Sequence, residues 1–192
     1  MFRIEFQYHH LQEYRRGGDS LSIPPHEANI AEEVTHSINT GSLKFDYFAP
    51  NEKHRLSVFG SIQHIDRDSY YGAGQNPNAY GGTTDLTWVA GAQYNYKFDK
   101  CLFIPAELTA GMEFNQDILQ DVMHGYNRVL DQNTNIASLF LQNEWKNARW
   151  GFLIGGRLDK HNLIDHLIFS PRVTMRYNPT KDINLRASYS FG

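Results

Sequence analysis

Hydrophobic and polar residues alternate with a period of two along most of this chain. At its start, Phe2, Ile4 and Phe6 alternate with Arg3 and Glu5. Successive side chains of a β-strand point to opposite faces, so this alternation predicts strands with one apolar and one polar face. Nine segments alternate in this way: residues 2–9, 43–47, 56–63, 86–97, 104–115, 137–145, 150–158, 172–177 and 183–191. The best helical candidate, residues 25–34, is a single short loop segment.

The links between these segments alternate between long and short. Tight turns rich in Asn, Asp, Pro and Lys are expected at residues 49–53, 99–100, 146–148 and 178–182. Long loops are expected at residues 10–34, 67–84, 116–135 and 160–168. In an antiparallel up-and-down sheet, this order places every long loop at one rim and every short turn at the other. Membrane barrels of the bacterial outer membrane have this asymmetry.

Aromatic residues cluster near the short turns. Amphipathic aromatic rings favour the membrane interface, although aromatic residues are also common in strands of any kind. A soluble antiparallel sheet with one solvated face gives the same alternation. Nothing in such a sheet, however, requires the long loops to lie at one rim and the aromatic residues at the other. The residues of this expected girdle are Tyr47, Phe48, Tyr96, Phe98, Phe103, Trp145, Trp150 and Tyr177.

Composition removes several other classes of protein. The net charge is −3, with 18 basic and 21 acidic residues, so no basic surface for nucleic acid is expected. Cys101 is the only cysteine, which excludes a disulfide framework. No nucleophile motif such as Gly-x-Ser-x-Gly is present, and the chain is not expected to be an enzyme. Mean hydropathy is low, as expected for strands that are apolar only at alternate positions.

The two ends of the sequence predict an internal piece of a larger barrel. Nine strands is an odd number, and the last segment stops at Phe191 and Gly192. An open sheet in lipid leaves two unpaired edges, each backbone group costing several kcal/mol. Residues 1–192 are therefore expected to form one partial barrel domain, which by itself would aggregate or pair edge to edge.

The second half of the chain resembles the mid-barrel region of TonB-dependent receptors. The resemblance is carried by residues 139–145, 155–159, 170–173, 176–179 and 185–190. It implies a 22-stranded barrel in the outer membrane of a Gram-negative bacterium, filled by an N-terminal plug domain. It also implies energy supplied through the TonB protein, and import of a siderophore, haem, cobalamin or a glycan. Residues 15–28 and 66–72 most resemble the cobalamin-type members of Bacteroidetes.

Several side chains are candidates for the site. Tyr70, Tyr71 and Tyr80 flank a run rich in glycine and asparagine, and are expected either to contact ligand or to form an interface set. Asp66, Asp68 and Asp85 lie near one rim and offer oxygen ligands for calcium, although no cofactor is otherwise expected. Ten charged residues of the polar face line a substrate path and contact the plug, or simply form the wet face of the sheet. These residues are Glu5, Lys44, Asp46, Glu107, Glu113, Glu144, Arg157, Arg172, Arg176 and Arg186.

Two other functions stay open on the sequence alone. One is a complete small outer-membrane barrel with a structural, adhesive or enzymatic role. The other is a soluble β-sandwich that binds sugars. A natural chain that continues beyond both ends would exclude the first, and a need for detergent would exclude the second.

Overall fold

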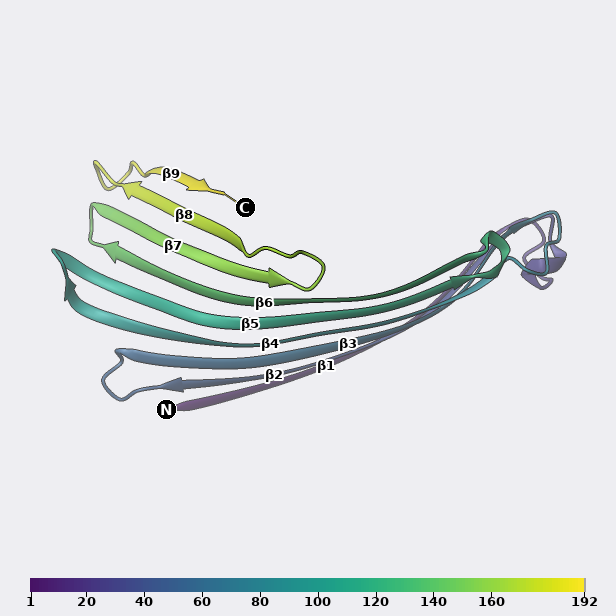
Figure 1. Cartoon of the computed structure of the whole chain (residues 1–192), viewed down its shortest axis with the longest axis horizontal. Coiled ribbons are helices and arrows are strands. Elements are labelled where there is room, and N and C mark those ends of the chain that lie inside the picture. Colours follow the sequence, from purple (N-terminus) through teal and green to yellow (C-terminus); the bar gives the residue numbers. More distant parts are fainter. Residues whose placement is uncertain (192) are drawn as a thin grey trace.

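The chain forms one antiparallel sheet of nine strands, in which each strand pairs with its neighbour in sequence (Figure 1). The computed structural model describes residues 1–191. The strands are β1 (Phe2–Gly18), β2 (Ile30–Phe48), β3 (His54–Ala73), β4 (Tyr80–Cys101), β5 (Ile104–Met123), β6 (Arg128–Lys146), β7 (Trp150–His161), β8 (Ile168–Tyr177) and β9 (Leu185–Ser190). Two 3-10 turns are also present, η1 (Pro25–Glu27) and η2 (His124–Tyr126). Among the described residues, no helix is long and apolar enough to span a bilayer. The predicted fold class and up-and-down order are confirmed.

The register of the strands separates an apolar face from a polar face. On β9, Leu185 pairs with Tyr177 and Ala187 with Met175, whereas Arg186 pairs with Arg176. Directly paired residues share a face, so Leu185 and Arg186 point to opposite sides of the sheet, as the alternation predicted. The same parity runs through every strand pair back to Phe2, which shares its face with Tyr47. We call the apolar side the outer face and the polar side the inner face.

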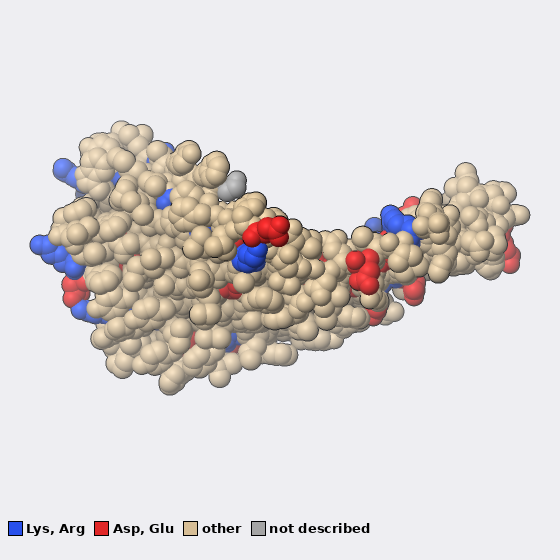
Figure 2. Space-filling model, in the orientation of Figure 1, with Lys and Arg blue, Asp and Glu red and all other residues tan. Residues whose placement is uncertain are grey.

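The outer face carries a band of exposed apolar side chains with no protein core beneath it. Leu43, Met112 and Leu139 are each between 55% and 59% exposed, which in water would be costly. On β4 the band runs from Tyr96 to Trp88, about 27 Å along the strand. A tilt of about 40° reduces this length to ~21 Å across a membrane, close to the apolar band of outer-membrane barrels. Figure 2 shows one face of the molecule, with charged side chains gathered at the short-turn end and along the narrow end, and few between them.

The short turns meet at one end of the sheet, and aromatic rings gather there. Trp150 stacks on Tyr177 with ring centroids 4.1 Å apart, and the Trp145 ring lies 6.0 Å from that of Phe152. All four of these residues lie on the outer face, so the predicted girdle is present on this side. Phe48 differs, because it lies on the inner face with Arg55 over its ring. The turn expected at residues 99–100 is displaced to residues 102–103 by an irregular register between Phe98 and Cys101.

Glycines on the inner face make room for aromatic rings of the neighbouring strand. A Cβ added to Gly111 would lie 2.3 Å from the Cζ atom of Phe140, its direct partner on β6. Gly91 receives the ring of Phe59 in the same way. An aromatic ring that covers a glycine restores contact area that the glycine lacks and fixes the register of the pair.

The predicted long loops are for the most part strand, which corrects the expectation from the sequence. Strands β1–β6 continue past the apolar band and form a narrow extension (Figure 1). The connections that leave the strands there are residues 19–29, 74–79 and 124–127, with residues 162–167 between β7 and β8. The outer face of the extension is more polar than the band, because His10, His64 and Gln116 continue the rows of the band there, although Ile118 and Val129 also lie on it. A strand whose outer face contacts water need not alternate between apolar and polar residues. The sequence pattern therefore does not identify it as a strand.

Candidate ligand-binding surface

A row of apolar side chains lies on the inner face of the extension. Leu11 pairs with Ile38, Ile38 pairs with Ile65, and Leu119 lies in the same row beyond Asp85. These strands are past the apolar band, so the apolar row is not accounted for by lipid. A hollow of about 560 Å³ opens over this row, large enough for a small molecule. Leu130 of β6 lines its far side.

A buried carboxylate fixes one side of this hollow. The side chain of Asp121 is 7% exposed and lies on β5 at the inner face. It accepts hydrogen bonds from the Thr83 hydroxyl at 2.6 Å, from Arg67 at 3.2 Å and from Arg128 at 2.5 Å. The Thr83 hydrogen bond is the main cause of a lowered pKa for Asp121, and the two arginines add to it against the opposing effect of burial. Asp121 therefore stays ionised and holds both guanidinium groups at the rim of the hollow.

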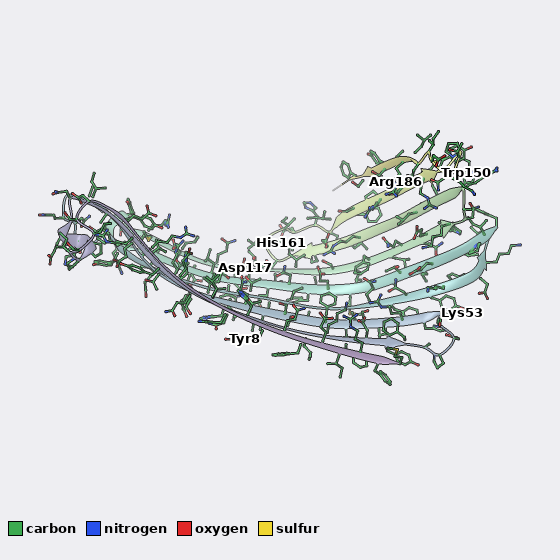
Figure 3. The ribbon with its side chains drawn as sticks, turned by 180° about the vertical axis from the view of Figure 1, so that it is seen from behind. Tyr8, Lys53, Asp117, Trp150, His161 and Arg186 are labelled. Atoms are coloured by element: carbon green, nitrogen blue, oxygen red, sulfur yellow. The ribbon has the colours of Figure 1, made fainter. Side chains whose placement is uncertain are left out.

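The opposite side of the hollow is acidic. Asp85 and Asp117 are diagonal neighbours on the inner face, because Asp85 pairs with Leu119 and Thr87 pairs with Asp117. Burial, and then the charge of Asp85, raise the pKa of Asp117. Figure 3 shows Asp117 near the point where the sheet narrows into the extension. The hollow thus combines apolar side chains, two arginines held by one aspartate, and the carboxylate of Asp85, with Asp117 in the next row. Such a surface suits a ligand that is partly apolar and partly polar.

The predicted tyrosine site is not brought together by the structure. Tyr70 is 1% exposed, and its hydroxyl donates to the backbone oxygen of Asn76 at 2.9 Å. It packs with Ala28, Ala31 and Ala79 in a small core at the tip of the extension. The ring of Tyr70 is thus enclosed by protein in this structure, and its contact with ligand stays a prediction.

The other two tyrosines lie on opposite faces. Tyr80 is 38% exposed on the outer face, and its hydroxyl lies 2.7 Å from Nδ1 of His26 in η1. Tyr71 follows Tyr70 on β3 and lies on the inner face, where it is half-buried and pairs with Glu32. Tyr71 therefore shares the inner face with the hollow, whereas Tyr80 helps to hold residues 19–29 against β4.

The predicted calcium ligands do not converge. Asp66 pairs with Thr84 and Asp68 with Gly82, which places both carboxylates on the outer face. Asp85 pairs with Ile65 and lies on the inner face. The sheet lies between the Asp85 carboxylate and those of Asp66 and Asp68, so the three cannot coordinate one ion. The described residues contain no group of three or more side chains placed to hold a metal.

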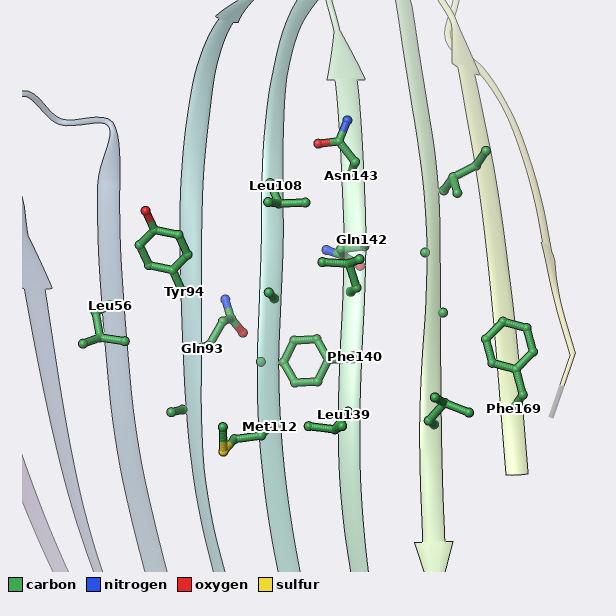
Figure 4. A pocket seen from close by; sticks show the side chains of 18 residues that line it. Leu56, Gln93, Tyr94, Leu108, Met112, Leu139, Phe140, Gln142, Asn143 and Phe169 are labelled. Carbon is green, nitrogen blue, oxygen red and sulfur yellow. The ribbon is translucent and has the colours of Figure 1, made fainter. Parts of the chain in front are cut away.

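Another hollow is on the lipid-facing side and belongs to the apolar band. It measures about 850 Å³ (Figure 4). Its lining includes the small residues Ala92, Ala110 and Gly156 beside the larger Tyr94 and Met112. Gln93, Phe140 and Gln142 contact it through the thin sheet but belong to the inner rows. Its surface is almost entirely apolar and carries no charged side chain. We assign it to contact with acyl chains and not to ligand recognition.

The sequence does not reveal Asp121, Arg67 and Arg128 as site residues, because its alternation predicts loops at residues 67–84 and 116–135. A signal was present: Asp117, Leu119, Asp121 and Met123 occupy every second position of one strand. Their partners across β4 and β6 are fixed only by the register. The site is therefore a product of pairing between strands that are distant in sequence.

Comparisons with known proteins agree with this architecture. Residues 5–192 match the family model described as TonB dependent receptor-like, beta-barrel. The structure is similar to that of the alcaligin outer membrane receptor FauA from Bordetella pertussis, with a TM-score of 0.71 and 11% identity, over 98% of this chain and 32% of that one. It is also similar to the unliganded ferric citrate transporter FecA, with a TM-score of 0.53 and 13% identity, over 82% of this chain and 27% of that one. The chain thus spans about a third of the length of these proteins, and at such identities the likeness concerns the fold. A comparison with curated proteins gave no match.

Proposed function

Because the chain belongs to the TonB-dependent receptor-like β-barrel family, we propose that it is part of the wall of a receptor that binds and imports a scarce nutrient. The family is one of outer-membrane receptors and transporters and not of enzymes, which agrees with the expectation from the sequence. The nutrient classes considered are cobalamin, siderophores, haem and glycans. As partners we propose a plug domain inside the barrel and the TonB protein, together with the lipid of a Gram-negative outer membrane.

One observation carries the proposal for where the nutrient binds. Past the apolar band, Ile38, Ile65 and Leu119 point inward over a hollow, while the outer face at the same height is mixed, with Asn39 and His64 beside Leu86 and Ile118. Burying apolar surface from water is worth about 25 cal/mol per Å², so an inward apolar patch favours an occupant with apolar parts. Arg67 and Arg128 on one side and Asp85 on the other would orient its polar groups.

Cobalamin is the first nutrient to test. Residues 15–28 and 66–72 resemble those of cobalamin-type receptors of Bacteroidetes. In the structure, residues 15–18 and 66–72 lie in the strands of the extension, with the turn η1 close by. The resembling residues therefore lie on the same part of the molecule as the hollow, which supports the proposal but leaves siderophores, haem and glycans as alternatives.

The experiment replaces two apolar side chains of the hollow in the full-length receptor. The double variant Ile65→Ser and Leu119→Ser should lower uptake of radiolabelled cyanocobalamin at limiting concentration, and leave the amount of assembled barrel unchanged. The matched control is Ile118→Ser, which removes a similar side chain from the outer face of the same strand. Parallel assays with ferric siderophores and haem identify the nutrient if cobalamin is not transported.

Two outcomes would contradict the proposed location. Uptake of every tested nutrient could be unchanged in the double variant, or the control could lower uptake as much as the double variant. In either case the inner face of the extension would not be the binding surface.

A further inference from the structure

A single amide interrupts the lipid-facing row of β6. Asn143 lies on the outer face, two residues inside the girdle residue Trp145. It pairs with Leu108 on β5 and with Ile154 on β7, so it is not at an edge of the sheet. A polar group in contact with lipid is costly unless it has a hydrogen-bond partner, so this position calls for a physical reason. The next outer positions of β6 are apolar: Leu141, Leu139 and Ala137.

The amide of Asn143 has a donor that the protein does not satisfy. In the part of the chain that the structure describes, Nδ2 of Asn143 is buried without a hydrogen-bond partner, and so is Nε1 of Trp145. Asn143 as a whole is half-buried and lines the lipid-facing hollow of about 850 Å³. A half-turn about its Cβ–Cγ bond, a torsion that is broad and roughly two-fold in asparagine, brings the NH₂ group to the open side. The acceptor for this donor then has to come from outside the protein.

The hollow continues from this amide toward the middle of the apolar band. Asn143 lies at its short-turn end, whereas Met112 and Leu139 lie at the other end (Figure 4). Four residues of β6 separate Asn143 from Leu139, which is about 13 Å along the strand. No charged side chain lines the hollow. It therefore fits an occupant that is apolar along its length and carries a hydrogen-bond acceptor at one end.

The depth of Asn143 in the membrane identifies the acceptor. Aromatic rings of the girdle lie at the level of the lipid headgroups. Asn143 is about 7 Å from Trp145 along the strand, or ~5 Å deeper in the bilayer at a strand tilt of about 40°. Acyl chains begin at this level, and the ester carbonyl at the head of each chain is an acceptor. In family barrels the short turns are periplasmic, so the lipid belongs to the periplasmic leaflet.

A second copy of the chain fits the hollow less well than an acyl chain does. A two-fold dimer brings the same patch of both copies together. Two hollows would then face each other and leave space between them, whereas close packing favours an occupant that fills the hollow.

We propose that Asn143 and the lipid-facing hollow form a binding site for one phospholipid of the periplasmic leaflet. The ester carbonyl of the lipid accepts a hydrogen bond from Nδ2 of Asn143, and the acyl chain lies in the hollow beside Ala92 and Ala110. Such a lipid is held at one place on the wall and exchanges more slowly than the lipid around it. This inference does not depend on which nutrient is imported.

The test measures lipid binding to the full-length receptor, purified and delipidated in detergent, by native mass spectrometry. Two phospholipids with the same headgroup and chain length are titrated, one with ester-linked and one with ether-linked chains. The ether lipid lacks the carbonyl, so the wild type should bind one ester lipid about tenfold more tightly than the ether lipid. Asn143→Leu keeps a similar volume and should bind both lipids equally, with the affinity that the wild type has for the ether lipid.

A second pair of variants tests the hollow itself. Ala92→Leu fills part of the hollow and should weaken the binding of both lipids. Ala90→Leu is the matched control, because Ala90 lies two residues away on the same face of β4 but does not line the hollow. All three variants place an apolar side chain against lipid, so barrel assembly, measured by heat-modifiable migration on gels, should be normal.

Three outcomes would overturn the proposal. The wild type could bind ester and ether lipids equally, or Asn143→Leu could retain the preference for the ester. The two alanine variants could also bind lipid alike. A wild type that binds no lipid but forms dimers that Ala92→Leu disrupts would assign the hollow to a second copy instead.

Discussion

Removal of the Asp121 carboxylate should open the extension locally without unfolding the barrel. Asp121→Ala takes away the one acceptor shared by the Thr83 hydroxyl, Arg67 and Arg128. Those three donors come from β3, β4 and β6, so the carboxylate on β5 ties four strands together. The variant leaves Arg67 and Arg128 next to each other with no negative charge between them.

The size of the effect follows from burial. A hydrogen bond to a charged group contributes about 1.5–3 kcal/mol when both partners are buried, and less where water reaches one of them. The side chains of Arg67 and Arg128 are 31% and 58% exposed, so most of the loss comes from Thr83 and Arg67. We expect about 2–3 kcal/mol in local stability, which corresponds to a roughly 30- to 140-fold larger open population.

The pH dependence of this effect has a definite sign. The Thr83 hydrogen bond and the two arginines lower the pKa of Asp121 below its value in an unfolded chain. The stability that the carboxylate contributes is therefore present above the unfolded pKa, and is lost as pH falls through the folded pKa. The difference between wild type and Asp121→Ala should shrink in acid.

Hydrogen exchange of the full-length receptor in detergent, read by mass spectrometry, tests this prediction. Amides of residues 119–130 should exchange faster in Asp121→Ala, whereas amides of the membrane band, such as residues 106–114, should not change. Asp68→Ala is the matched control, because Asp68 is an exposed acidic residue on the outer face of the same extension. The reasoning is refuted if residues 119–130 exchange at the wild-type rate in Asp121→Ala, or if Asp68→Ala has the same effect.

Three further predictions concern other parts of the molecule. Tyr70→Phe should cost about 1 kcal/mol in the tip core, seen as faster proteolysis at residues 74–79 of the folded receptor; unchanged cleavage would mean that its hydroxyl is not structural. Gly111→Val should reduce barrel assembly, measured by heat-modifiable migration on gels, because the new Cβ would meet the Phe140 ring. The control Gly82→Ala should assemble normally, because the space around Gly82 is open. Asp117→Asn should raise stability at pH 7, since burial raises the pKa of Asp117 and makes its charge costly. The gain should vanish below about pH 4, where the carboxyl group is protonated, and urea titration at two pH values would detect the difference.

The sequence by itself determined the strands that cross the membrane and the direction of their side chains. Alternation from Ile183 to Phe191 placed Leu185 and Arg186 on opposite faces, and the register agrees. It also determined the sequential order and the end at which the aromatic rings lie, because short turns force neighbouring strands to pair. These features depend on residues that are close in sequence, because a period of two is enough to predict a strand and the face on which each side chain lies.

Only the tertiary structure decided the extension and everything built on it. Strands such as residues 10–18 carry polar side chains on the outer face, so no period separates them from a loop. The partners of Asp121, the burial of Tyr70 and the opposition of Arg176 and Arg186 depend on the register between strands. The same register placed Asp85 on the other face from Asp66 and Asp68 and removed the predicted calcium site. A shift of one residue would reverse each of these outcomes, and that shift is set by pairing across the whole sheet rather than by local sequence.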